Sequence, residues 1–332
     1  MKYSTPHRLV FTEKQKVELE SFELPGLESD EVLVRTERSL MSTGTENIVF
    51  NRLFDPGTHW DRWVKYPFYP GYASSGVVEA VGEGVDTHKP GDRVAWRARH
   101  RSHMVMKADE VYPMPDSVSF EDAPWFALAK IAFNGAYMAN YKLGEDVVII
   151  GAGPIGQMTL RWARAAGARR PIVIDPVPQR EKMAINGGAS AYLTMPADQA
   201  LEKVKEILGG KQPEVVIDTT GHEAVFPSAL ALVADMGRVI VLGDTGRPTK
   251  QCLTSDVIKR GVHIIGAHDC FQFPEWTQGT IAELFFGMIV DGRINLEGIN
   301  THLFEPENCM SAYGIANSDR ANTMGIQFNW AD

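Results

Sequence analysis

The chain has little cysteine. Only Cys252, Cys270 and Cys309 occur among its 332 residues. Three scattered thiols are too few for a disulfide framework or for the cysteine-rich lobe that holds a structural zinc ion. The composition therefore favours a reducing compartment, and we expect the protein in the cytoplasm.

Positive charge and long apolar runs are also scarce. The formal net charge is −9, whereas a nucleic-acid or anionic-membrane surface needs a basic face. No apolar run approaches the ~20 residues that span a bilayer. The first eleven residues lack the apolar core of a signal peptide. We expect neither a nucleic-acid nor a membrane partner.

The chain changes its rhythm near Asp146. Short β-type runs separated by Gly and Pro turns precede this point, and apolar strands alternating with amphipathic helices follow it. Such alternation predicts a parallel sheet covered on both faces. Six strands match the doubly wound (Rossmann) dinucleotide fold, an α/β class. The expected strands are Val147–Ile150, Ile172–Asp175, Ala191–Leu193, Glu214–Asp218, Arg238–Gly243 and His263–Gly266.

The chain is long enough for two domains. Helical patterns at Thr277–Val290 and Glu307–Ser318 and a final strand at Gly325–Trp330 follow the parallel region. We expect this tail to rejoin the first domain. The predicted division is a discontinuous β-rich substrate domain of residues 1–127 and 271–332, and a dinucleotide-binding domain of residues 128–270.

A glycine motif follows the first of these strands, in the segment Gly151-Ala152-Gly153-Pro154-Ile155-Gly156. Gly151 permits a tight turn, Gly153 lets the backbone approach a pyrophosphate, and Gly156 allows close packing of helix on strand. The helix that begins at Pro154 and Ile155 offers free N–H groups and a positive dipole to the phosphates. The strand–motif–helix order predicts a dinucleotide site rather than an empty glycine turn.

Asp175 ends the next strand and is expected to accept hydrogen bonds from the adenosine ribose. A carboxylate there repels a 2′-phosphate, so we predict NAD, with NADP the less favoured cofactor. Arg180 is the nearby cation that weakens this preference.

Several further motifs carry a resemblance to a known family. They are Pro70-Gly71-Tyr72-Ala73-Ser74-Ser75-Gly76-Val77-Val78, Val81-Gly82, Gly91-Asp92-Arg93-Val94, Asp218-Thr219-Thr220-Gly221 and Val241-Leu242-Gly243. With the glycine motif, they resemble the medium-chain dehydrogenase/reductase superfamily over essentially the whole chain. Ser42-Thr43-Gly44-Thr45-Glu46 and Tyr69-Pro70-Gly71-Tyr72 look like its zinc-lacking branch with bacteriochlorophyllide dehydrogenase and sugar- or polyol-associated members.

This resemblance implies a GroES-like fold for the β-rich domain and a homodimer or homotetramer. It also implies that Thr219, Gly243, Gly266 and His268 contact the cofactor. The strand His263–Ala267 is the expected edge for pairing with a second copy.

Zinc-using relatives hold the metal with a Cys, a His and a third Cys or acidic residue. The corresponding positions here are Thr43, Tyr72 and, with looser alignment, Ala127, and Ala73 replaces the usual neighbouring Glu. A hydroxyl, a phenol and a methyl group cannot form a tetrahedral zinc site. We therefore predict an enzyme without metal.

Without zinc, side chains must move the proton and stabilise the oxyanion. Thr45 matches a proton-relay position of the relatives, or is a turn residue. Glu46 is a base, or a cap for backbone donors. Lys130 lies in an apolar stretch and is an acid/base group, a member of a structural ion pair, or a surface lysine whose stem alone is buried. Tyr72 assists as a phenol, stacks on substrate, or packs in the core.

The segment before the Tyr69–Tyr72 motif is rich in aromatic residues. Trp60 and Trp63 offer faces for a sugar or a cyclic alcohol, His59 adds a polar handle, and a loose core is the alternative. Thr43 and His268 are further substrate candidates. The cationic run Arg97–His103 is expected to be a solvated loop, with contact to an anionic substrate as the alternative.

The leading hypothesis is zinc-independent, NAD-dependent oxidation of a secondary alcohol on a sugar, polyol or cyclic substrate. Reduction of an enone or quinone is the second, although such enzymes usually use NADPH, which Asp175 disfavours. A cofactor-binding protein without enzymatic activity is the third.

Overall fold

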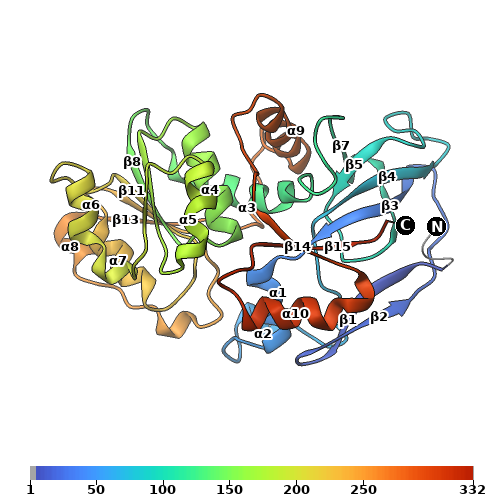
Figure 1. Cartoon of the computed structure of the whole chain (residues 1–332), viewed down its shortest axis with the longest axis horizontal. Helices are drawn as coiled ribbons and strands as arrows, with labels where there is room; N and C mark the ends of the chain where they lie inside the picture. Colours follow the sequence, from blue (N-terminus) through green and yellow to red (C-terminus); the bar gives the residue numbers. More distant parts are fainter. Residues whose placement is uncertain (1–4, 332) are drawn as a thin grey trace.

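The computed structural model describes residues 5–331, which form two lobes side by side (Figure 1). One lobe holds a six-stranded parallel sheet, and the other holds a seven-stranded mixed sheet. The first and the last elements of the chain, β1 (His7–Glu13) and β15 (Gly325–Asn329), both lie in the mixed-sheet lobe (Figure 1).

The parallel sheet has the strand order β10-β9-β8-β11-β12-β13. All five pairings are parallel, so the predicted doubly wound sheet is confirmed. The strands are β8 (Asp146–Ile150), β9 (Arg170–Ile174), β10 (Ala191–Leu193), β11 (Val215–Asp218), β12 (Arg238–Val241) and β13 (His263–Gly266).

Helices cover both faces of this sheet because its strands are apolar on both sides. Val147 and Ile149 pack with Leu160 on one face, whereas Val148 and Ile150 pack on the other face. The first face is covered by α3 (Trp125–Ala139), α4 (Pro154–Ala165) and α5 (Glu181–Asn186), and the second by α6 (Leu201–Ile207) and α7 (Val225–Leu232). Alternate residues of a strand point to opposite faces, which explains this division.

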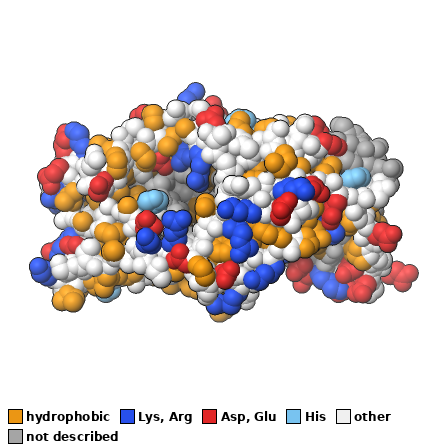
Figure 2. Space-filling view, turned by 90° about the horizontal axis from the view of Figure 1, so that it is seen from below, with side chains coloured by type: hydrophobic (Ala, Val, Ile, Leu, Met, Phe, Trp, Pro, Cys, Tyr) orange, Lys and Arg blue, Asp and Glu red, His pale blue; other side chains and the backbone are white. Residues whose placement is uncertain are grey.

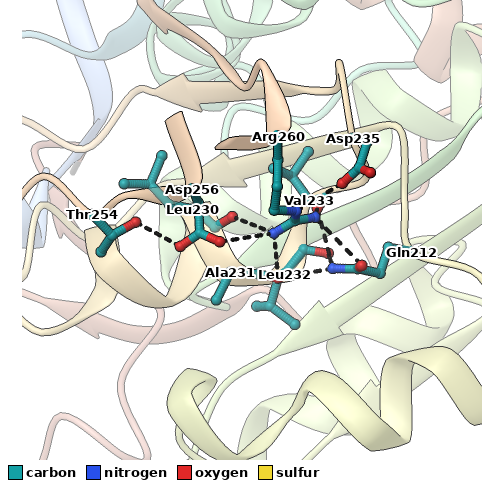
Figure 3. A network of polar contacts seen from close by, with 9 residues as sticks. All are labelled: Gln212, Leu230, Ala231, Leu232, Val233, Asp235, Thr254, Asp256 and Arg260. Atoms are coloured by element: carbon teal, nitrogen blue, oxygen red, sulfur yellow. Dashed lines mark hydrogen bonds and ion pairs between the residues drawn. The ribbon is translucent and has the colours of Figure 1, made fainter. Parts of the chain in front are cut away.

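Arg260 fixes the end of α7 next to the edge strand (Figure 3). It ends α8 (Asp256–Arg260) and donates to the carbonyl oxygens of Leu230, Ala231 and Val233, while Asp235 and Asp256 balance its charge. The last carbonyls of a helix lack partners within it, so this guanidinium caps them. It also holds the start of β13 in place.

The mixed sheet has the order β14-β15-β3-β4-β5-β7, with β6 paired to β3. Its strands are β3 (Glu31–Leu40), β4 (Ser74–Val81), β5 (Arg93–Trp96), β6 (His103–Lys107), β7 (Val111–Pro113), β14 (Asn300–Phe304) and β15 (Gly325–Asn329). Because β15 pairs with β3, the tail rejoins the first domain. The helices of this tail are α9 (Gln278–Val290) and α10 (Cys309–Ser318). The limits of 1–127 with 271–332 and of 128–270 remain a proposal, and α3 runs across the first boundary.

The sequence does not predict several elements of the mixed-sheet lobe individually. Among them are the hairpin β1 (His7–Glu13) and β2 (Lys16–Ser21) and the helices α1 (Thr43–Asn51) and α2 (His59–Trp63). Leu9, Phe11, Val49, Phe50 and Trp60 join them in one core with α10. In residues 5–331, every helix is too short or too polar to cross a membrane.

Candidate active site

A cavity of about 1100 Å³ opens between the two lobes. Lys and Arg side chains gather around the middle of the face seen in Figure 2, along the seam between the lobes. Most of the predicted site residues line this cavity. They are Thr43, Thr45, Glu46, His59, Trp60, Trp63, Tyr72, Gly151, Gly153, Pro154, Ile155, Gly156, Asp175, Arg180, Thr219, Gly243 and His268.

The glycine motif forms one end of the cavity. Gly151 has a φ of +97°, which only glycine adopts readily, and α4 begins directly after Gly153. A Cβ on Gly156 would lie 1.9 Å from the carbonyl oxygen of Gly151, whereas the space beside Gly153 is open. The turn therefore leaves room for a pyrophosphate against the helix N-terminus, and the residues present fit a dinucleotide.

Asp175 lies at the carboxyl end of β9 and is only 5% exposed. Its Oδ2 accepts from the Ala152 amide at 2.7 Å and from Arg180 Nη1 at 3.1 Å, and its Oδ1 accepts from the Val177 amide at 2.9 Å. Arg320 from the C-terminal tail also lines this end and accepts from Arg180 through its carbonyl oxygen at 2.8 Å. The predicted carboxylate is in place, and it is already paired with a cation.

A cluster of hydroxyl groups includes Thr43 and Tyr72, the positions that the family resemblance aligns with zinc ligands. Ser42 Oγ and Tyr72 Oη are hydrogen-bonded, and Thr43 and Thr45 begin α1 beside them. Burial raises the pKa of the Tyr72 phenol, although hydrogen bonds from Ser42 and Thr45 oppose the shift. The phenol is therefore a neutral hydrogen-bond donor across the usual pH range.

The side chains at the metal position do not fit zinc. Thr43 and Tyr72 carry no thiolate or imidazole, and Ala127 is fully buried within α3. Within residues 5–331, no three His, Cys, Asp or Glu side chains are grouped so as to hold a metal ion. Hydroxyl groups replace the sulfur and nitrogen ligands that zinc prefers, so the side chains here do not match the metal.

Glu46 lies beneath this cluster and is 2% exposed. Its Oε1 accepts from the Ser42 amide at 2.7 Å, while its Oε2 accepts from the Tyr313 hydroxyl and lies 3.2 Å from His100 Nε2. Burial and the Glu46 charge raise the pKa of Tyr313 well above its usual value. With these partners, Glu46 anchors the start of α1. This arrangement favours the predicted role as a cap for backbone donors over the role as a base.

Lys130 and Gly266 are the predicted site residues that do not line the cavity. Lys130 is 5% exposed, and its Nζ donates to Oδ1 of Asp269 at 3.0 Å and to the Asp269 carbonyl. Arg97 donates two hydrogen bonds to the same carboxylate, from Nη1 to Oδ1 at 3.0 Å and from Nη2 to Oδ2 at 2.8 Å. Burial favours the neutral acid, but Arg97 and then Lys130 lower the pKa of Asp269 below its usual value. Lys130 is thus an ion-pair partner behind the cavity wall.

A second charged cluster joins the two lobes. His59 Nε2 lies 2.9 Å from Oδ2 of Asp244, and His268 Nε2 lies 3.7 Å from the same atom. Asp244 raises the pKa of His268 to about 9, against its burial. The Cys270 amide donates to His268 Nδ1 at 3.1 Å, which opposes that shift by favouring the neutral ring. His268 is thus a cavity-lining imidazole whose pKa the neighbouring carboxylate raises.

The aromatic loop is divided between core and cavity. Trp60 is 4% exposed, whereas Trp63 is 49% exposed and packs edge-on against Phe68 at 5.1 Å. Both line the cavity. Trp63 thus offers a ring face to a ligand, while Trp60 also serves the core.

The expectation of a solvated loop at Arg97–His103 is wrong for its histidines. His100 is fully buried against Glu46 and His103 is 8% exposed, because Ser39, Ser102 and Glu46 supply their hydrogen-bond partners. Arg99 is exposed and Arg101 is partly buried, whereas the Arg97 side chain is only 16% exposed.

Sequence reasoning did not single out Ser42, Tyr313, Asp244 or Arg320 as site residues. Asp244 follows β12, and the carboxyl end of a parallel strand was a usable signal. Tyr313 carries no such signal, because only the return of the tail brings α10 beneath α1.

Two family models match the chain. Residues 28–116 match the alcohol dehydrogenase GroES-like domain, and residues 154–284 match the zinc-binding dehydrogenase model. The chain belongs to the medium-chain dehydrogenase/reductase superfamily and is an oxidoreductase of the alcohol dehydrogenase type. The predicted family and the GroES-like fold are thereby confirmed.

Individual relatives are distant but nearly full length. An L-threonine 3-dehydrogenase of Bacillus licheniformis is 26% identical over 86% of this chain and 89% of its own length. A sorbitol dehydrogenase of Bacillus subtilis is 27% identical over 73% of this chain and 77% of its own. A solved oxidoreductase of unknown specificity from Escherichia coli superimposes with a TM-score of 0.85, at 20% identity, over 99% of this chain and all of that one.

Proposed function

We propose that the protein is an NAD-dependent, zinc-independent dehydrogenase that oxidises a secondary alcohol of a sugar, polyol or cyclic substrate. The observation that carries this proposal is the hydrogen-bonded Ser42–Tyr72 pair beside Thr45, in the cavity that the glycine motif also lines. Hydroxyl groups at this place can hold an alcohol oxygen that a metal holds in zinc-using relatives.

The cavity residues divide the chemistry between them. The bound nicotinamide supplies the hydride acceptor. Tyr72 donates a hydrogen bond to the oxygen that becomes a carbonyl, and Thr45 orients the same oxygen. We assign the exchange of the proton to His268, because its pKa of about 9 makes it an acid at neutral pH and a base above that value. Lys130 and Arg97 position Asp269, the residue next to His268.

NAD is the proposed cofactor because Asp175 places a carboxylate where the ribose hydroxyls are expected. Arg180 and Arg320 lie at the same end of the cavity, and their positive charges would favour the 2′-phosphate of NADP. Fluorescence titration with NADH and NADPH separates the two effects. We expect tighter binding of NADH, and tighter binding of NADPH would contradict the assignment.

The proposed activity is tested by NADH formation with a panel of sugars, inositols and cyclic secondary alcohols. We expect turnover that EDTA does not reduce and that added zinc does not increase. The same protein is offered enones with NADH and with NADPH. Reduction of an enone without oxidation of any alcohol would support the reductase alternative instead, and activity only after zinc addition would refute zinc independence.

We also propose a cytoplasmic homodimer or homotetramer that pairs through β13. This strand is one of the two edges of the parallel sheet, and His263, Ile264 and Gly266 on it are exposed. The free thiols of Cys252 and Cys270 are exposed, which suits a reducing compartment. Size-exclusion chromatography with light scattering tests the assembly, and Ile264→Lys is expected to shift it toward the monomer.

A further inference from the structure

Three arginines, Arg97, Arg99 and Arg101, form a row along the chain, and the first two line the cavity. In the segment Arg97–Arg101, the even residues Ala98 and His100 are buried, whereas the odd arginines are exposed or half-buried. The His100 amide donates to the Pro70 carbonyl and the His100 carbonyl accepts from the Leu9 amide, and the chain bends at this residue. Before the bend, Ala98 is buried while Arg97 and Arg99 both line the cavity, so these two side chains lie on the cavity side.

Each guanidinium of this row lies over an aromatic ring. Arg97 is 5.1 Å from the ring centre of Tyr72, Arg99 is 5.8 Å from that of Phe68, and Arg101 is 5.4 Å from that of Phe22. Arg97 therefore lies next to the Tyr72 phenol, which we propose to contact the reacting oxygen. Arg99 and Arg101 contact other rings.

The row carries more positive charge than the neighbouring carboxylates balance. Arg97 is paired with Asp269. Among residues 5–331, neither Arg99 nor Arg101 has a carboxylate within ion-pair distance: Arg99 donates only to the Tyr69 carbonyl, at 2.7 Å, and the buried Nε of Arg101 has no partner. Burial, then repulsion by Arg8 and Arg99, lowers the pKa of Arg101 to about 10. Such a cluster is stabilised by an anion.

Arg99 and Tyr69 line the same cavity as Tyr72 and Thr45. Only Ala98 lies between Arg97 and Arg99. The Cα atoms of the two arginines are therefore roughly 6–7 Å apart in an extended chain. A small molecule whose hydroxyl group contacts Tyr72 can therefore reach Arg99 with its other end. Phe68, the ring beneath Arg99, also packs against the exposed Trp63, which continues the wall with an apolar face.

We propose that the substrate is a polyhydroxylated or cyclic alcohol that carries an anionic group, a phosphate ester or a carboxylate, and that Arg99 binds this group. Arg101 lies close enough for its charge to repel that of Arg99, but only Arg99 of the two lines the cavity, so Arg99 is the specificity-determining residue. This inference rests on the proposed dehydrogenase function and names the class of its substrate.

The test compares matched substrates with the full-length protein and NAD⁺: neutral polyols or sugars, their monophosphates, and their sugar acids. We expect the wild type to show a kcat/KM more than about tenfold higher for one anionic member than for its neutral counterpart. Arg99→Gln should lower this ratio about 10–100-fold, mainly through KM, because a charge-assisted contact is lost. Arg99→Lys should restore part of it, and added salt should weaken the preference.

Lys14→Gln is the matched control. It removes one positive charge from the exposed β1–β2 turn of the same lobe and should leave the ratio unchanged. The phosphate and carboxylate arms identify which anion is preferred. A wild type that favours the neutral member, or an Arg99→Gln variant that changes both members equally, would overturn the proposal while leaving the dehydrogenase function intact.

A direct binding measurement keeps the two proposals separate. If no member of the panel is oxidised, the dehydrogenase proposal fails, and calorimetric titration with the same monophosphates and sugar acids still tests Arg99. Binding by the wild type that Arg99→Gln weakens at least tenfold supports the anion site. Absence of binding at millimolar concentration refutes it.

Discussion

The two ends of the cavity are built in different ways. At the cofactor end, backbone makes the site: Gly151, Gly153 and Gly156 shape a turn whose N–H groups face the cavity. At the substrate end, side chains make it, and they come from remote segments such as Tyr72, Arg97 and Asp269. A backbone site tolerates little change in size, whereas a side-chain site can exchange its chemistry while the fold persists. The hydroxyl side chains of Thr43 and Tyr72 within the fold of the superfamily are in keeping with that difference.

The largest expected effect is at the substrate end. Asp269→Ala removes the carboxylate shared by Arg97 and Lys130, whose side chains are only 16% and 7% exposed. Leaving buried cations unpaired should lower the free energy of unfolding by about 3 kcal/mol, measured by urea denaturation. Asp92→Ala is the control, because its partner Lys89 is 81% exposed and that pair contributes little. Equal losses in both variants would show that the buried pairs add no stability.

Gly156→Ala tests the cofactor end. The new methyl group meets the Gly151 carbonyl, and the overpacking should cost about 1–3 kcal/mol in unfolding free energy. The affinity for NADH should fall at least tenfold because the turn must shift, as measured by fluorescence titration. Gly314→Ala in α10 has open space around it and should instead raise stability slightly. A Gly156→Ala protein that binds NADH normally would show that the motif tolerates displacement.

Tyr72→Phe separates chemistry from cofactor binding. Loss of the donor at the reacting oxygen should lower kcat about 10²-fold, while the affinity for NADH is unchanged. Tyr137→Phe also removes a phenol hydroxyl, one that donates to Glu275 at the surface, and should leave kcat as in the wild type. A Tyr72→Phe enzyme with full turnover would remove the phenol from the mechanism.

The smallest effect concerns His268 and pH. Its pKa is raised from 6.5 to about 9 by Asp244, so its contribution to stability is fully present below pH ~6.5 and disappears as the pH rises through about 9. The side chain is 47% exposed, which limits the contribution to less than about 1 kcal/mol. His268→Gln should lower Tm at pH 6 but not at pH 10. Asp244→Asn should abolish that difference.

The same variant tests the proton assignment. In the wild type, kcat/KM for alcohol oxidation should rise with pH toward about 9, because the neutral imidazole accepts the proton. His268→Gln should flatten this rise, whereas Lys130→Met should retain it at reduced stability. Loss of the rise in Lys130→Met alone would make Lys130 the acid/base group.

The cofactor end was predictable from sequence because its signals are local. All six parallel strands and the turn of the glycine motif occur close to the positions that the apolar runs and glycine residues predicted. Helix α1 was not predicted, since Thr43, Gly44 and Thr45 are poor helix formers. Burial of Val49 and Phe50 against α10 stabilises this helix, and no local pattern reports that contact. The partners of Glu46 and Lys130 were hidden for the same reason, as each is supplied by a distant part of the chain.

The tail of the chain has a consequence for synthesis. Tyr313 supplies the hydroxyl that Glu46 accepts beneath α1, and β15 pairs with β3. On a ribosome, the parallel-sheet lobe can fold while these segments are still being made, but the lobe that emerged first must wait for the last residues. The support beneath the hydroxyl cluster is thus completed only when translation is nearly finished. We expect the dinucleotide-binding lobe to form before the mixed-sheet lobe that binds the substrate.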